Sequence, residues 1–303
     1  MRKDLSTPVL FLIFNRPDTT QQVFNAIRNA RPPRLYIAAD GPRDQRPEDR
    51  ELCTSARSVT NQVDWPCDVQ TLLREQNLGC RIAISSALDW FFQREEEGVI
   101  LEDDCFPDPS FFLFCQELLS HYRDDHRIMH ISGDNFQQGR VRGTGSYYFS
   151  RYSHVWGWAS WRRAWKFYDV TMSSFPRFAQ EGGMRSIFRS SQERRYWQRK
   201  FSLARRGTID TWDYQWAYAI WTHHGLSIIP NVNLVANIGV GAGATHTAGA
   251  HRGTLASGVG SIGNLTHPLF LLPDEVADRF TFHRHFLGPL SARIRRTIMK
   301  VLR

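Results

Sequence analysis

Hydrophobic residues in the first half of the chain fall into short continuous runs, and longer amphipathic stretches separate these runs. Apolar runs of this length are typical of strands that are buried on both faces of a sheet. We expect strands at residues 8–14, 34–39, 69–73, 98–101 and 128–132, and helices that end at residues 30 and 63 or span 80–94 and 109–123. Strands alternating with helices predict an α/β fold, with a mostly parallel central sheet and helices on both faces.

The pattern changes after about residue 139, where glycine and aromatic residues become dense. Residues 175–206 predict one or two basic helices, residues 210–223 a helix, and residues 226–229 a strand. Residues 237–263 are rich in Gly, Ala, Thr and His, which favours a long functional loop. We therefore expect one domain over 1–283, in two halves of about 1–138 and 139–283, and a separate helix over 284–303.

The composition of the 303 residues, with 42% hydrophobic and 22% charged side chains, is that of a globular protein. No apolar run approaches the roughly 18–20 residues that cross a bilayer, and the N-terminus lacks the pattern of a secretory signal. The five cysteines form no C-x-x-C pair, which argues against a structural zinc site. We therefore expect a cytoplasmic protein with reduced thiols.

The net charge of +8 is concentrated in two segments. Residues 185–206 carry +7 and residues 284–303 carry +6, which leaves −5 for the remainder. A nucleic-acid-binding protein would carry a more uniform positive charge, so we expect no nucleic-acid partner. Two basic patches on a mildly acidic body suit phosphate groups, on lipids or on nucleotides.

Three acidic residues, Glu102, Asp103 and Asp104, directly follow the predicted strand at 98–101. Ligands of open parallel sheets bind beyond the carboxyl ends of the strands, where these acids emerge. Adjacent carboxylates repel one another, and a hard cation such as Mg²⁺ or Mn²⁺ would relieve this repulsion and bridge to a diphosphate. The alternative is a solvated acidic turn. Asp40 and Arg16 follow neighbouring strands at the same edge, and this convergence favours a binding site.

The acids belong to a longer motif at residues 99–112, in which an apolar strand, Glu-Asp-Asp, an apolar-Pro segment and a Phe-Phe helix follow one another. Asn-Arg-Pro at 15–17, Gly-Cys-Arg at 79–81 and Trp-Gly-Trp at 156–158 accompany it. With these motifs the chain resembles GT-A fold nucleotide-diphospho-sugar glycosyltransferases. It is similar to the N-acetylglucosaminyltransferase group and to bacterial polysaccharide glycosyltransferases. The resemblance covers about residues 7–245, and the acid motif is its most specific part.

The resemblance implies a metal-dependent, inverting transfer of a sugar from a UDP- or GDP-linked donor to an acceptor hydroxyl, on a glycan or a lipid-linked glycan. Matched residue by residue, Asp104 would bind Mn²⁺ or Mg²⁺, Asp103 would face the ribose and Glu102 the donor sugar. Arg16 and Asp40 would line the nucleotide pocket. Arg81 would lie near the base or the phosphates.

An inverting transferase also needs a base for the acceptor hydroxyl. The family places this carboxylate near a tryptophan, and the match at residues 211–216 assigns the role to Asp213. The family motif often has two adjacent acids where this chain has Tyr214, so Asp210 stays a second candidate. The alternative is that Asp213 only caps a helix whose aromatic face is core.

The resemblance also implies a late histidine at the metal or diphosphate. His246, in the Gly-rich loop, has the matching position, and an exposed loop histidine is the alternative. Aromatic rings cover the apolar faces of sugars, and we expect Trp158 and Trp212 to do so, with the other tryptophans mostly in the core.

Apolar residues between 290 and 303 recur at helical spacing, with basic residues on the other faces. Such a helix either lies on an anionic membrane surface, beside a lipid-linked acceptor, or docks on the domain. The first case predicts a protein peripheral to the inner face of the membrane.

Two other classes of function share these features. A metal-dependent nucleotidyltransferase or phosphohydrolase would also place acids at strand ends. A non-catalytic binder of nucleotide sugars or nucleic acid would need no base. The intact acids at 102–104 and the acidic body argue against a binder.

Overall fold

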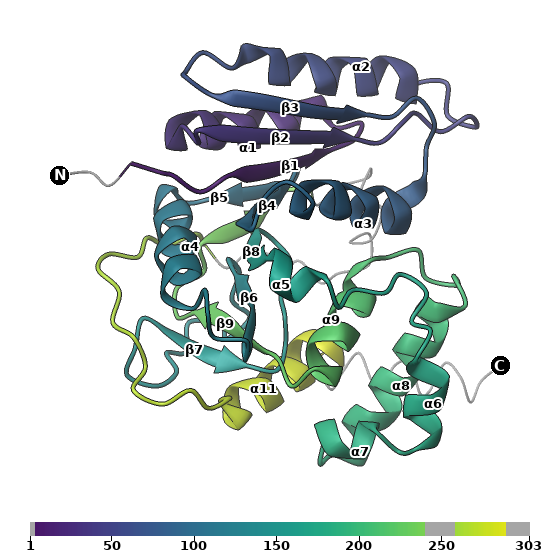
Figure 1. Cartoon of the computed structure of the whole chain (residues 1–303), viewed down its shortest axis with the longest axis vertical. Coiled ribbons are helices and arrows are strands. Elements are labelled where there is room, and N and C mark those ends of the chain that lie inside the picture. The colour runs from purple at the N-terminus through teal and green to yellow at the C-terminus, as the bar shows by residue number, and fades with distance from the viewer. Residues whose placement is uncertain (1–3, 240–257, 289–303) are drawn as a thin grey trace.

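The structure is a computed structural model, and it describes residues 4–239 and 258–288. Its centre is an eight-stranded sheet in the order β3-β2-β1-β4-β8-β6-β9-β7, with a two-stranded sheet β10-β5 beside it (Figure 1). The predicted α/β fold with a mostly parallel sheet is confirmed. Among the described residues, no helix is long and apolar enough to cross a membrane.

The first half of the chain builds the parallel half of the sheet. Its strands are β1 (Val9–Ile13), β2 (Arg34–Ala39), β3 (Asp68–Leu73) and β4 (Glu97–Glu102). Its helices are α1 (Pro17–Ala30), α2 (Asp49–Val59), the 3-10 turn η1 (Thr60–Gln62), α3 (Gly79–Phe92) and, after the short strand β5 (Cys105–Pro107), α4 (Pro109–His121). Because β1 pairs in parallel with both β2 and β4, the carboxyl ends of these three strands meet at one edge.

The second half inserts antiparallel strands. β8 (Trp158–Trp161) lies antiparallel between β4 and β6 (Ile128–Ser132), β9 (Leu226–Pro230) runs parallel to β6, and β7 (Tyr147–Ser150) closes the edge. β10 (Val235–Asn237) pairs with β5. The helices here are α5 (Arg162–Trp165), α6 (Phe175–Gln180), α7 (Met184–Ile187), α8 (Ser191–Arg205), α9 (Asp213–Thr222), α11 (Glu275–Thr281) and a π-helical turn η2 (Phe282–Phe286).

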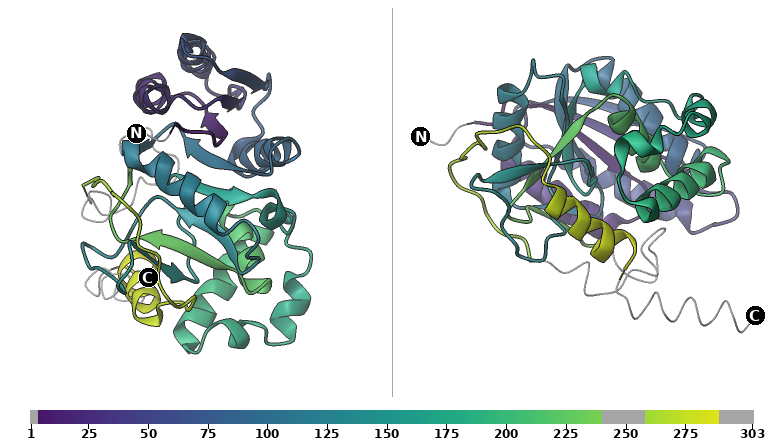
Figure 2. Two further views of the ribbon diagram at one scale, coloured as in Figure 1. Left: turned by 60° about the vertical axis from the view of Figure 1, so that its left-hand side comes forward. Right: turned by 90° about the horizontal axis from the view of Figure 1, so that it is seen from below.

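Two apolar cores lie on opposite faces of the sheet. Alternate residues of β1 separate into them: Phe11 belongs to the core under α1, α2 and α4, and Leu12 to the core under α3, α5, α8 and α9. Figure 2 shows these helices on both sides of the twisted sheet. Strands covered on both faces are apolar at most positions, which explains the nearly continuous apolar runs in the sequence.

Some boundaries differ from the predictions. Residues 175–206 form three helices rather than one or two, because Gly182 and Gly183 separate α6 from α7 and the extended Phe188 ends α7. Gly182 has φ +76°, and a Cβ on Gly183 would lie 2.2 Å from the Phe178 ring. Most of the predicted loop at 237–263 and of the C-terminal helix at 284–303 lies outside the described residues.

Candidate active site

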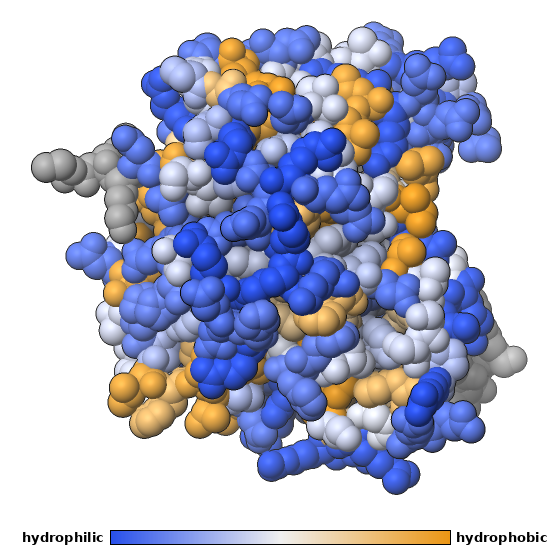
Figure 3. Space-filling view, viewed as in Figure 1, coloured by the Kyte–Doolittle hydropathy of each residue, from blue (hydrophilic) through white to orange (hydrophobic). Residues whose placement is uncertain are grey.

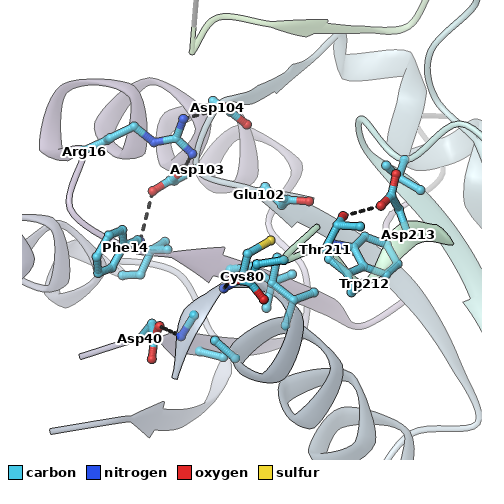
Figure 4. Close-up of a pocket in the computed structure, with 18 of the residues that line it drawn as sticks. Phe14, Arg16, Asp40, Cys80, Glu102, Asp103, Asp104, Thr211, Trp212 and Asp213 are labelled. Atoms are coloured by element: carbon cyan, nitrogen blue, oxygen red, sulfur yellow. Dashed lines mark hydrogen bonds and ion pairs between the residues drawn. The ribbon is translucent and has the colours of Figure 1, made fainter. Parts of the chain in front are cut away.

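A cavity of about 420 Å³ opens at the carboxyl ends of β1, β2 and β4. Its walls come from the segments that follow these strands, from the start of α3 and from the segment that leads into α9. Figure 4 shows Glu102 between two groups, with Arg16, Asp103 and Asp104 on one side and Thr211 to Asp213 on the other. The cavity therefore joins residues from Leu12 to Asn237, which lie far apart in the sequence.

One wall is an arginine held between two carboxylates. The Arg16 guanidinium binds a carboxylate oxygen of Asp103 and lies 2.7 Å from Asp104 Oδ2. The backbone N–H of Phe14 donates to the other oxygen of Asp103 at 3.0 Å. Asp103 is only 2% exposed, and burial raises the pKa of its carboxyl, whereas Arg16 acts in the opposite direction. The ion pairs fasten the end of β1 to the end of β4.

Glu102 is the last residue of β4 and lines the middle of the cavity. Burial raises the pKa of its carboxyl, and the negative charges of Asp104 and Asp213 act in the same direction. The carboxylates of Glu102, Asp104 and Asp213 thus share one electrostatic environment across the cavity.

Two carboxylates from distant parts of the chain occupy the N-terminus of α3. Asp40 accepts hydrogen bonds from the backbone N–H groups of Leu78 and Gly79, and from the Asn77 side chain at 2.9 Å. Asp210 accepts from the N–H groups of the next two residues, Cys80 at 3.0 Å and Arg81 at 3.3 Å. Burial is the largest influence on the Asp40 carboxyl and raises its pKa. Asp40 and Asp210 therefore act as caps of α3, a position that the helix dipole favours for negative charge.

Arg81 is not among the residues that line the cavity. Its backbone N–H donates to Asp210, and its backbone carbonyl accepts from the Ser85 hydroxyl at 2.7 Å. The structure thus brings Arg16, Asp40, Glu102, Asp103 and Asp104 together as expected, and leaves Arg81 outside the cavity lining, with its guanidinium near Gly207.

The opposite wall is the segment before α9. Asp213 is the first residue of this helix, and the Thr211 hydroxyl donates a hydrogen bond to its carboxylate. Trp212 lines the cavity with a side chain that is 2% exposed. A carboxylate in the first helical turn interacts favourably with the helix dipole, which also agrees with the alternative role of Asp213 at a helix start.

Trp158 does not line the cavity, contrary to its expected contact with the donor. Its side chain is fully buried, and its ring stacks on Trp212 at 5.4 Å and on His130 at 5.1 Å. The reason is its place in β8, a central strand that is covered on both faces. Trp158 therefore packs against Trp212 within the core and does not reach the cavity.

Several lining residues were not predicted from the sequence. The guanidinium of Arg43 lies 5.3 Å from the Phe14 ring and pairs with the buried Asp49. Arg74 lines the cavity and donates to the Ser86 hydroxyl at 2.7 Å. Arg43 lies three residues beyond Asp40, so a search of the turns after each strand would have found it. Arg74 directly follows β3 and would have been found in the same way.

A second segment of the chain, at the end of β10, contacts Asp104. The Ile238 N–H donates to the Asp104 backbone carbonyl at 2.8 Å. A Cβ on Gly239 would lie 2.3 Å from Asp104 Oδ2 and 2.7 Å from the Arg16 guanidinium, so only glycine fits there. His246 lies outside the described residues.

Within residues 4–239 and 258–288, no three His, Cys, Asp or Glu side chains are grouped so that they could hold a metal ion by themselves. The lining residues include six carboxylates and three guanidiniums. The donor atoms are therefore mainly carboxylate oxygens, the ligands that hard divalent cations prefer.

No protein-family model matches the chain. No curated protein matches it either. Similar solved structures include HddC from Yersinia pseudotuberculosis, with 9% identity and a TM-score of 0.32 over 54% of this chain and 80% of that chain. They also include UDP-glucose pyrophosphorylase without ligand (10% identity, TM-score 0.32, 54% of this chain and 79% of that chain) and complexed with UDP-glucose (11%, 0.27, 49% and 65%). Identities and TM-scores this low carry no argument about activity. The functional argument therefore rests on the cavity.

Proposed function

We propose that this protein is a metal-dependent glycosyltransferase. It would move a sugar from a nucleotide-diphosphate donor to an acceptor hydroxyl, with inversion, in the synthesis of a glycan or polysaccharide. The acceptor would be a glycan or a lipid-linked glycan.

The observation that carries the proposal is the charge of the cavity. Six carboxylates face three guanidiniums. Two of these guanidiniums are already engaged, Arg16 by Asp103 and Asp104, and Arg43 by Asp49. A diphosphate that entered would meet net negative charge, so its binding requires a cation to enter with it.

The side chains fit such a cation. Mg²⁺ and Mn²⁺ sites for nucleotides commonly use one or two carboxylates, and phosphate oxygens and water complete the shell. Asp104, beside Asp103 and Glu102, offers this kind of ligand without a closed protein cage. A divalent cation bound there would neutralise charge on the diphosphate leaving group as a Lewis acid.

Side chains of this protein would bind the donor sugar and accept the proton of the acceptor. Glu102 faces the space between the two walls and would contact the donor sugar, and Trp212 would cover an apolar face of a sugar. Asp213 would accept the proton of the acceptor hydroxyl as that oxygen attacks the anomeric carbon. Its position across the cavity from Asp104 suits an in-line displacement, in which the nucleophile approaches opposite the leaving group.

A metal-dependent nucleotidyltransferase remains the second candidate, because acids at these strand ends serve phosphoryl chemistry equally well. A nucleotidyltransferase needs positively charged side chains that are free to bind pyrophosphate. Arg74 forms no ion pair within 4 Å among the described residues, although its charge acts on the Asp40 carboxyl, and this guanidinium is the observation that favours the nucleotidyltransferase.

The first test is calorimetric binding of UDP and GDP, with Mn²⁺ and with EDTA, to the wild type and to Asp104→Ala. We expect binding of one nucleotide that requires the metal and is lost in the variant. Asp124→Ala removes an exposed acid outside the cavity and should bind as the wild type does. Binding that survives both EDTA and Asp104→Ala would contradict the metal assignment.

A product assay separates the two enzymes. With a nucleotide sugar as substrate, a glycosyltransferase releases the nucleoside diphosphate, slowly to water and faster to an acceptor. A nucleotidyltransferase instead incorporates labelled pyrophosphate into nucleoside triphosphate when given the nucleotide sugar. Pyrophosphate exchange without release of nucleoside diphosphate would refute the proposed transfer.

A further inference from the structure

The segment that leads into α11 exposes three large apolar side chains. Leu269 is 85% exposed, and Phe270 and Leu272 are each 70% exposed. We call these three residues the apolar hook. The chain after it is fixed to the sheet, because Pro273 forms a bridge with Phe149 of β7. Figure 3 shows apolar side chains gathered at the lower left of the molecule, the end where β7 and the start of α11 lie in Figure 1.

Three guanidiniums gather around one aromatic ring at the other end of α11. Arg140, Arg142 and Arg284 lie 4.4, 5.7 and 6.0 Å from the centre of the Phe280 ring. We call these arginines the basic cluster. None of them forms an ion pair within the described residues, and the remaining segments, 1–3, 240–257 and 289–303, contain no Asp or Glu. Three like charges held together in this way favour an anionic ligand.

The hook and the cluster belong to one continuous surface. The hook ends two residues before Asp274, which caps α11, and Phe280 lies one residue before the end of this seven-residue helix. Gly145, on the loop after Arg142, lies against Pro268, because an added Cβ would be 3.0 Å from that ring. α11 therefore separates the two features by only about 10 Å.

The acids at the start of α11 do not cancel the cluster's charge. The Asp274 carboxylate accepts hydrogen bonds from two backbone N–H groups of its own helix. Glu275 pairs with Arg151 at 3.3 Å, and Asp278 is buried. The surface therefore combines protruding apolar side chains with uncompensated positive charge.

We infer that the apolar hook and the basic cluster form a docking surface for an anionic lipid bilayer. The hook would enter the acyl region, and the arginines would contact lipid phosphates. A second copy of the chain fits less well, because it would bring the same basic cluster and a further net charge of +8 to the interface. This surface lies at the β7 edge of the sheet, whereas the cavity lies at β1, β2 and β4.

The test is co-sedimentation of the full chain with vesicles of phosphatidylcholine, with and without phosphatidylglycerol. We expect binding that requires phosphatidylglycerol and weakens as salt is added. The triple variant Leu269→Ser, Phe270→Ser, Leu272→Ser should lose about tenfold in partition, and so should Arg140→Gln, Arg142→Gln, Arg284→Gln.

Matched controls change the same residue types elsewhere. Val69→Ser with Leu73→Ser alters exposed apolar residues of β3, and Arg185→Gln, Arg195→Gln, Arg199→Gln alters exposed arginines near α7 and α8. Both should bind vesicles as the wild type does, and all variants should keep the wild-type melting temperature and metal-dependent nucleotide binding. Equal losses in the control and test variants would overturn the inference. So would wild-type vesicle binding by the hook variant, or a wild-type dimer that the hook variant converts to a monomer in sedimentation velocity.

Discussion

Asp210 provides a sharp test of the structure, because its sequence position suits a base and its contacts suit a helix cap. Asp210→Ala would leave the N–H groups of Cys80 and Arg81 at the start of α3 without their acceptor. Loss of an N-terminal cap costs about 0.5–2 kcal/mol, and loss of a charge at a helix N-terminus about 0.3–1 kcal/mol. One of the two hydrogen bonds is long at 3.3 Å, so we expect a total near the middle, about 1–2 kcal/mol.

Thermal unfolding followed by circular dichroism measures this effect, and the melting temperature should fall by about 2–6 °C. Asp210→Asn keeps an acceptor oxygen and should lose less than half as much. Because the role is structural, Asp210→Asn should retain transfer activity within a few-fold. An unchanged melting temperature in Asp210→Ala, or an inactive but fully stable Asp210→Asn, would refute the assignment of this residue as a cap.

Three further predictions concern single charged groups. Asp213→Asn should lower transfer at least about 100-fold while calorimetric binding of the nucleotide stays within about threefold, as expected for a base. Arg16→Met leaves the buried Asp103 without its ion pair, and urea unfolding should show a loss of about 3 kcal/mol, part of which Arg16→Lys restores. Burial raises the pKa of Asp278 to about 7, so the stability that its protonated form provides is present at low pH and is lost as the pH rises through about 7. Glu102, whose pKa is also raised, titrates in the same range, so the comparison with Asp278→Asn isolates the effect of Asp278. Between pH 6 and pH 8 the wild type should lose about 1.4 kcal/mol more in urea unfolding than Asp278→Asn does.

The parallel half of the fold was predictable because β1, β2 and β4 are largely buried, whereas the edge strand β3 is mostly exposed. β2 and β6 begin and end at the predicted residues, 34–39 and 128–132, since most positions of such a strand are apolar. The three-residue β5 was missed, because one exposed and two buried positions carry no periodic signal. The antiparallel insertion of β8 between β4 and β6 was not predictable either, because that order depends on pairing between residues about 60 positions apart.

Some residues of the candidate site were also predictable from the sequence, and others were not. The acids at 102–104, together with Arg16 and Asp40, could be assigned to one edge because parallel strands connected by helices present their carboxyl ends together. Trp158 could not be distinguished from Trp212 by its spacing. Packing buries both side chains, and only the tertiary structure shows that Trp212 lines the cavity while Trp158 does not.

The sequence by itself determined the class of fold and the edge of the sheet where chemistry is concentrated, because both depend on local periodicity and on which residues follow each strand. The tertiary structure alone decided which charges are paired. In the structure Arg16 forms ion pairs with Asp103 and Asp104, and Asp40 and Asp210 accept hydrogen bonds at the N-terminus of α3. These partners lie between 38 and 130 residues apart, and no local pattern records them, because a hydrogen bond depends on distance in space rather than along the chain.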